Sequence, residues 1–184
     1  MKAYVKTSWE SLPRAIFYFL SGLSILLAGT GCHALSKAER EMCQQSPQAL
    51  CTGVVKAYKA QDLDAFCDLA VGYADLKDMM SKVKVPASAK RESLSKMGAT
   101  GYKKMVQDSL QTILKTSPIE WPKASFEKFE PSRNPVEIAT GYKMLLGKMH
   151  IQQGELHFVQ AITIVEAGKN KYFMGDFSPI EPLK

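Results

Sequence analysis

The chain has few of the residues from which catalytic and metal sites are most often built. Its 184 residues include only three histidines and four cysteines. The cysteines form no Cys-x-x-Cys pair, which counts against a thiol redox motif and against a zinc site with three or four ligands. Nothing near His150 or His157 supplies a nucleophile-and-base pattern. We therefore predict no catalytic residue and no cofactor, and we favour binding over catalysis.

A nucleic-acid-binding signature is also lacking. The net charge is +6, but the basic residues are spread along the chain, and the short pairs Lys90-Arg91 and Lys103-Lys104 are typical of solvated helix faces. No nucleic-acid-binding motif accompanies them. The chain holds neither an internal repeat nor a low-complexity tract. These absences exclude nucleic acid from the predicted partners.

The first 32 residues carry the clearest pattern in the chain. Lys2, Lys6 and Arg14 give a basic start, and the 17 residues from Ala15 to Gly31 hold no charge. Small residues, Gly29-Thr30-Gly31, lead into Cys32. A basic start, an apolar core and a small-residue cleavage site together predict a secretory signal.

This segment resembles the lipobox of bacterial lipoproteins, with Gly29 at a position where that family usually has an aliphatic residue. The resemblance implies removal of residues 1–31 and attachment of lipid to Cys32, and stable anchoring needs more than one acyl chain. In a Gram-negative cell, the resemblance together with His33 in place of an aspartate implies sorting to the outer membrane, with the domain facing the periplasm. Two alternatives stay open: an uncleaved anchor, because the apolar run reaches the short limit of a spanning helix, and ordinary cleavage near Ala34.

Three cysteines remain after Cys32, and an exported chain meets oxidising conditions that favour disulfides. Three thiols permit three single pairings. We favour Cys43–Cys51, because Ser46-Pro47 can turn the chain between them, with Cys43–Cys67 as the next candidate. The apolar neighbours of Cys67 also suit a small core residue.

The periodicity changes from helical to alternating near the middle of the chain, which predicts an α+β domain with helices packed on a curved antiparallel sheet. The predicted organisation is a signal peptide over 1–31, a lipidated cysteine and polar tether over 32–46, and one domain over 47–184. Ser46, Asp62 and Thr100 are expected helix caps, Ser117-Pro118 a helix end, and Val83–Pro86 an extended piece. Strands are expected at 124–130, 136–146, 156–164 and 171–177, with turns at 153–154 and 168–170 and a bulge near Gln160.

The stretch from Val54 to Phe66 resembles the opening helix pair of the nuclear transport factor two-like superfamily, also called the cystatin-like cone. An amphipathic helix, a short acidic break at Gln61-Asp62 and a second helix match that pattern, and the strands up to 177 resemble its sheet. The resemblance implies a pocket between helices and sheet. Aromatic side chains are the candidates to line it, with ordinary core packing as the alternative: Trp121, Phe126, Tyr142, Phe158 and Tyr172.

His150 and His157 are the most specific candidates for a functional pair of side chains. If Gln153-Gly154 is a two-residue turn, the two histidines lie directly opposite each other on neighbouring strands. Two adjacent imidazoles suit a pH switch or a metal. We expect no metal, because a stable site needs a third ligand that the sequence does not supply.

The sequence is compatible with three functions. The favoured one is a lipid-anchored, non-catalytic cell-envelope protein that binds a partner protein or a small apolar ligand. The second is a cone-fold envelope enzyme with an internal acid/base pair that includes His157. The third is a structural subunit of an envelope complex. In each, the membrane is a partner through the lipid on Cys32.

Overall fold

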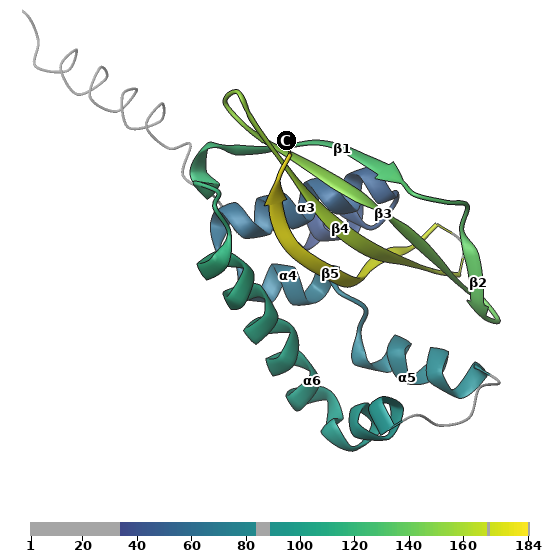
Figure 1. Cartoon of the computed structure of the whole chain (residues 1–184). Helices are drawn as coiled ribbons and strands as arrows, with labels where there is room; N and C mark the ends of the chain where they lie inside the picture. Colours follow the sequence, from purple (N-terminus) through teal and green to yellow (C-terminus); the bar gives the residue numbers. More distant parts are fainter. Residues whose placement is uncertain (1–33, 84–88, 169, 184) are drawn as a thin grey trace, which may run out of the picture. The chain divides into compact units, whose positions relative to one another are not determined.

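The computed structural model describes residues 34–83, 89–168 and 170–183, and Ala34–Lys184 form one compact unit. The predicted export signal, Cys32 and most of the predicted extended piece at Val83–Pro86 lie outside the described residues. Within these ranges, no helix combines the length and the apolar composition needed to cross a membrane. The architecture is α+β, as predicted: helices come first and a curved antiparallel sheet follows (Figure 1).

Helices occupy the first two thirds of the described chain. They are α2 (Lys37–Cys43), α3 (Pro47–Ala60), α4 (Leu63–Leu69), α5 (Tyr73–Lys82) and α6 (Ala89–Thr116), and the short 3-10 helix η1 (Trp121–Lys123) precedes the sheet. The caps at Ser46 and Asp62 are confirmed, since the side chain of each accepts a hydrogen bond from the backbone N–H three residues on. Between these helices, Gln61 adopts the left-handed conformation with φ of 51°.

Two helical details differ from the prediction. The segment predicted as a tether contains α2, because Ser36 and Glu39 form a reciprocal capping box and Leu35 is buried. The start predicted at Thr100 lies about two residues too late: Gly98, non-helical with φ of 71°, divides α6 into two helices, and the second already includes Thr100. Glycine reaches this conformation at little steric cost, so Gly98 is a better indicator of the helix break than the polar Thr100.

Five strands form one sheet: β1 (Ala124–Pro131), β2 (Val136–Ala139), β3 (Tyr142–Gln153), β4 (Leu156–Ala167) and β5 (Tyr172–Pro182). The order is β1-β3-β4-β5, all antiparallel, with β2 paired to the other end of β3. The bulge predicted near Gln160 is confirmed, because the register between β4 and β5 shifts between Gln160 and Ile162. The predicted strand at 136–146 is wrong: it is two strands joined at Thr140-Gly141, where Gly141 has φ of 82°.

The main core lies between the helices and one face of the sheet. Helix α3 packs on β1 and β5, and α6 packs on α4 and β5; in Figure 1, α3 lies behind the strands. Since side chains alternate along a strand, Ile151, Phe158 and Ile164 point into this core. A smaller cluster forms on the opposite face near β2, where Tyr142 and Val165 pack with partly buried side chains that include Leu76 and Met79 of α5. The rest of that face is called the open face below.

The outer edge of β1 is closed by a side chain of α3. The amide oxygen of Gln48 accepts a hydrogen bond from the N–H of Phe129 at 2.9 Å, and its amide nitrogen donates to the carbonyl of Phe129 at 3.2 Å. The two bonds imitate the pairing of a neighbouring strand, and they block an edge that otherwise invites association with another chain.

We expect Gln48→Ala to lower the free energy of unfolding by about 1–2 kcal/mol, because two hydrogen bonds to the edge strand are lost. Gln48→Glu keeps the acceptor for the Phe129 N–H and should retain part of the stability that Gln48→Ala loses. Urea unfolding measures the loss, and light scattering at high concentration measures association through the freed edge. Equal stability of wild type and Gln48→Ala contradicts the proposed role.

Candidate functional site

A hollow of about 460 Å³ opens on the face of the sheet away from the main core. Its walls come from the middle of β3, β4 and β5 and from the end of β1, at Ser132, Leu146, Gly147, Lys148, Ala161, Ile162, Thr163, Asp176, Phe177 and Ser178. Apolar and small side chains dominate, with one cation, Lys148, and one anion, Asp176. Such a surface suits an apolar group that carries a polar or charged end.

The bend of β5 shapes one wall of this hollow. The hydroxyl of Ser178 accepts a hydrogen bond from the N–H of Ala161 at 3.1 Å and donates to the carbonyl of Pro179 at 2.8 Å. Asp176 accepts from the N–H of Phe177 at 2.8 Å. These local bonds hold the strand where the ladder is interrupted by the bulge.

Two histidine–carboxylate pairs lie on the same face, nearer to the β3–β4 turn than the hollow. Glu130 accepts a hydrogen bond from Nε2 of His150 at 3.1 Å, and Glu127 accepts one from Nδ1 of His157 at 3.0 Å. The Lys128 ammonium also lies 3.6 Å from the Glu130 carboxylate. His150 is buried, whereas the His157 side chain is 41% exposed. Each imidazole is thus oriented by its own carboxylate from β1.

The prediction that His150 and His157 lie directly opposite each other is wrong. His150 pairs with Val159, and His157 pairs with Gln152. The turn is Gly154-Glu155, not Gln153-Gly154, and Gly154 has φ of 61°. Hairpin turns of two residues favour a positive φ at the first central position, so glycine comes first in the turn and the register moves by two residues. The histidines share the open face as diagonal neighbours, and His157 does not lie in the interior.

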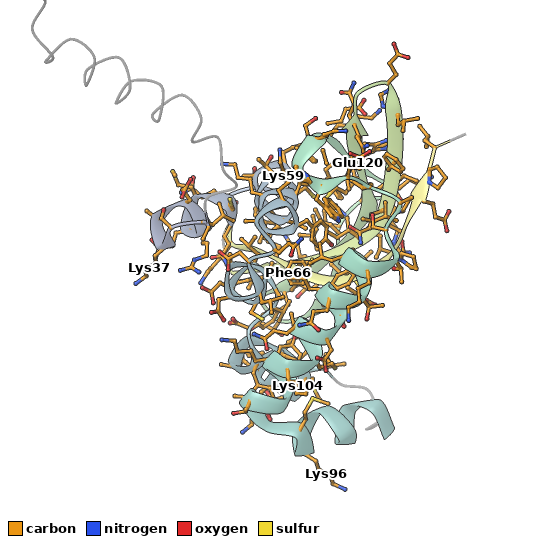
Figure 2. The ribbon with its side chains drawn as sticks, turned by 90° about the vertical axis from the view of Figure 1, so that its left-hand side faces the viewer. Lys37, Lys59, Phe66, Lys96, Lys104 and Glu120 are labelled. Atoms are coloured by element: carbon orange, nitrogen blue, oxygen red, sulfur yellow. The ribbon has the colours of Figure 1, made fainter. Side chains whose placement is uncertain are left out.

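Side chains pack closely between α3 and the sheet around Gln160. Gln160, fully buried, accepts a hydrogen bond from the Tyr58 hydroxyl at 3.2 Å and donates to the Ser178 carbonyl at 2.8 Å. The ring of Phe66 stacks on Tyr58 at 5.5 Å and meets Phe177 edge-on at 5.7 Å; Figure 2 labels Phe66 near the middle of the domain. Burial raises the pKa of Tyr58, which keeps its hydroxyl protonated as the donor.

The five aromatic candidates for an interior pocket belong to two different clusters of packed side chains. Trp121 and Phe158 are buried in the main core, and Tyr172 packs partly against it. The Trp121 ring lies 4.6 Å from the Tyr58 ring, and no described residue accepts a hydrogen bond from its Nε1. Tyr142 belongs to the smaller cluster and donates to Asp78 at 2.8 Å. Phe126 is half-buried against the main core. Ordinary core packing therefore accounts for these rings.

The three cysteines of the described chain are free thiols, so the structure does not support the favoured Cys43–Cys51 disulfide. The thiol of Cys43 lies against Gly53, where an added Cβ would come within 2.6 Å of Sγ. Cys51 is two residues from Gly53 and points about 200° away around the helix. Burial raises the pKa of Cys51 to about 12, which leaves this thiol protonated and unreactive.

The second disulfide candidate is also absent, because Cys67 faces α6. Its thiol lies 3.9 Å from the carbonyl of Lys103 and borders a second hollow, of about 230 Å³, together with Tyr73 and Tyr102. Burial is the main cause that raises the pKa of Cys67. The thiol is therefore a weak nucleophile, in agreement with the packing role considered for it.

No group of three or more histidine, cysteine, aspartate or glutamate side chains within the described ranges is placed to hold a metal ion. The hollow on the open face was not predicted from the sequence. Alternation places Leu146 and Lys148 on one face of β3, but only the bulge in β5 brings Asp176 and Ser178 beside them. Comparison with family models, with curated proteins and with solved structures gives no match to this chain.

Proposed function

We propose that the protein is a lipid-anchored, non-catalytic component of the bacterial cell envelope that binds a small apolar ligand or a partner protein. The binding site in this proposal is the hollow on the open face. The export signal and Cys32 support the location, through their resemblance to a lipobox. The helix pair α3–α4 followed by a curved sheet supports a cone-like domain of the nuclear transport factor two-like type.

The placement of free space carries the binding part of the proposal. The side of the sheet that faces the helices is occupied by Tyr58, Phe66 and Gln160, all without exposed surface. The hollow of about 460 Å³ lies on the other side and falls within the range of about 300–1,000 Å³ typical of small-molecule sites. Its lining gives an apolar floor between Lys148 and Asp176, which suits an apolar group with a polar end.

The anchor is tested by metabolic labelling with a palmitate analogue, in wild type and in Cys32→Ala, followed by membrane fractionation. We expect label and membrane retention in wild type and loss of both in the variant. An unlabelled wild type that is cleaved and soluble contradicts the anchor. An unlabelled wild type that stays in the membrane at full length supports the spanning alternative instead.

The binding site is tested by filling the hollow. Ala161 is exposed at its floor, so Ala161→Phe should fold normally while its ring occupies the space that a ligand needs. The matched control is Gln111→Phe, which adds the same ring at an exposed position of α6. Purified proteins are compared by mass spectrometry of extracted lipids and by crosslinking in envelope extracts.

We expect the amount of bound ligand or crosslinked partner to be about tenfold or more lower in Ala161→Phe than in wild type and Gln111→Phe, because a filled pocket excludes its ligand. A small molecule lost from the extract identifies an apolar ligand, and a crosslinked protein lost from the gel identifies a partner. Retention of the same ligand and the same crosslinks by Ala161→Phe places binding elsewhere and contradicts the assigned site.

A further inference from the structure

The folded domain begins immediately after the cysteine that the proposal assigns to lipid. Ala34 is exposed, but Leu35 is only 5% exposed and belongs to the main core. Ser36 then caps α2, its hydroxyl accepting from the N–H of Glu39 at 3.3 Å. Only His33 separates Cys32 from the first described residue. A flexible tether is therefore missing from the stretch where it was expected.

Helix α2 is fixed to the rest of the domain by specific contacts. The guanidinium of Arg40 lies 3.2 Å from the carboxylate of Asp68. The amide of Gln44 donates to the Asp68 carbonyl at 2.8 Å, and the Gln44 carbonyl accepts from the N–H of Tyr172 at 2.8 Å. Contacts to α4 and β5 thus hold α2 in one orientation within the domain. A surface that contacts α2 therefore also determines the orientation of the whole domain.

The exposed side of α2 has the spacing of one helix face. Its members are Lys37, Ala38, Glu41 and Met42, and the exposed Gln45 follows them just beyond the end of the helix. Met42 is 57% exposed and is the one large apolar side chain among them. These five residues are called the α2 face below.

We propose that the α2 face rests on the phospholipid surface in which Cys32 is anchored. This inference depends on the lipidation of Cys32 proposed above. Two residues span at most about 7 Å even when extended, so Ala34 stays within that distance of the lipidated residue. A helix of seven residues is about 10 Å long, so an α2 that lies flat brings the whole α2 face to the headgroups.

The side chains of the α2 face suit that surface. The Lys37 ammonium faces lipid phosphates at the start of the helix, and Met42 inserts its apolar side chain at the boundary of headgroups and acyl chains. The carboxylate of Glu41 is repelled by anionic headgroups, so we expect the α2 face to prefer a surface rich in zwitterionic lipid. In Figure 2, Lys37 lies at the left margin of the domain, and Glu120 lies well away from it in the upper part, beside the strands. The backbone N–H of Glu120 donates to the side-chain oxygen of Gln153 at 2.8 Å, beside the β3–β4 turn. This end of the sheet is then directed away from the membrane.

The test places the photoreactive residue benzoylphenylalanine at Met42 or at Leu156 of the otherwise complete chain in its native membrane. The two positions are matched in exposure, at 57% and 58%, but Leu156 lies beside the β3–β4 turn. We expect about fivefold more phospholipid adducts at position 42 than at 156, since apolar side chains beside a short anchor meet the lipid surface. A flexible Gly-Ser spacer of about 20 residues inserted between His33 and Ala34 gives a mean reach of ~25 Å and should remove that difference.

The outcomes separate this inference from the proposed function. Equal adduct yields at both positions, in a protein whose Cys32 carries the palmitate label, overturn the membrane-facing α2 face and leave the anchor intact. A protein crosslinked at position 42 in place of lipid overturns it as well and assigns the α2 face to a partner. Absence of the label on Cys32 overturns both proposals together.

Discussion

Gly147→Ala should be the most damaging single-methyl change in the sheet. A Cβ at this position of β3 would lie 2.4 Å from two ring atoms of Phe129 and 2.6 Å from the carbonyl oxygen of Glu130. The first contact can relax only if a buried ring moves, and the second is with backbone. We expect the free energy of unfolding to fall by about 2–3 kcal/mol, the usual cost of overpacking a closely packed site.

The matched control for this change is Gly175→Ala in β5. There the nearest atom to an added Cβ is a methyl group of Val165 at 3.1 Å, and neither glycine has a positive φ. Alanine is preferred over glycine in a strand by about 0.5–1 kcal/mol, so we expect a change near zero at Gly175. Urea unfolding of both variants measures the difference, and equal losses at the two positions contradict the close approach of Phe129 to Gly147.

A rescue experiment identifies the ring as the cause. Phe129→Leu removes the ring atoms that a methyl group at position 147 would meet, at the cost of some core packing. In the double variant we expect the two losses to be less than additive by about 1 kcal/mol, as is usual for residues in contact. Strict additivity shows that the backbone contact with Glu130 dominates.

The sequence predicted the parts of the fold that depend on local chemistry. The serine and aspartate caps of α3 and α4 and the change from helical to alternating periodicity are local signals, and each was confirmed. The errors occur where a single glycine decides the backbone. Gly141 divides a continuous alternating pattern into β2 and β3, and Gly154 shifts the β3–β4 register by two residues. Alternation alone does not reveal such a shift, because a two-residue slip leaves every side chain on its own face.

The candidate site was harder to predict for a different reason. The aromatic residues are conspicuous in the sequence, and they fill the core. The hollow is lined mostly by unremarkable residues such as Ala161, Thr163 and Ser178, which become neighbours only through long-range pairing of three strands. Similarly, α2 gives a weak sequence signal because it has seven residues, and its stability comes from contacts with α3 and α4.

Gln160→Leu should have the second large effect, because it removes a fully buried side chain that bonds both to a helix and to the neighbouring strand. Leucine has a similar size, so the change tests hydrogen bonding more than volume. It leaves the buried Tyr58 hydroxyl without its acceptor and the half-buried Ser178 carbonyl without the Gln160 donor. Each unsatisfied buried group costs about 1–3 kcal/mol, so we expect a loss of about 2–4 kcal/mol in the free energy of unfolding.

A double-mutant cycle with Tyr58→Phe divides that loss between the two bonds. Tyr58→Phe alone should cost about 1–2 kcal/mol, since Gln160 keeps its bond to Ser178. The double variant has no Tyr58 hydroxyl that could be left without an acceptor. Its loss of unfolding free energy should therefore be smaller than the sum of the two single losses by about 1 kcal/mol or more. A loss that is fully additive contradicts a direct coupling of Tyr58 with Gln160.

The same substitution links stability to the proposed site. The carbonyl of Ser178 faces Gln160 in the core, while its hydroxyl holds Ala161 at the hollow on the open face. If Gln160 maintains the bend of β5, then Gln160→Leu should weaken retention of the ligand or partner as well as the fold, whereas Tyr58→Phe should affect the fold alone. Ligand retention by lipid mass spectrometry, measured below the unfolding temperature of both variants, checks this difference. Equal retention by the two variants shows that the bulge keeps its shape without Gln160, and the wall of the hollow then depends on the local bonds of Ser178 and Asp176.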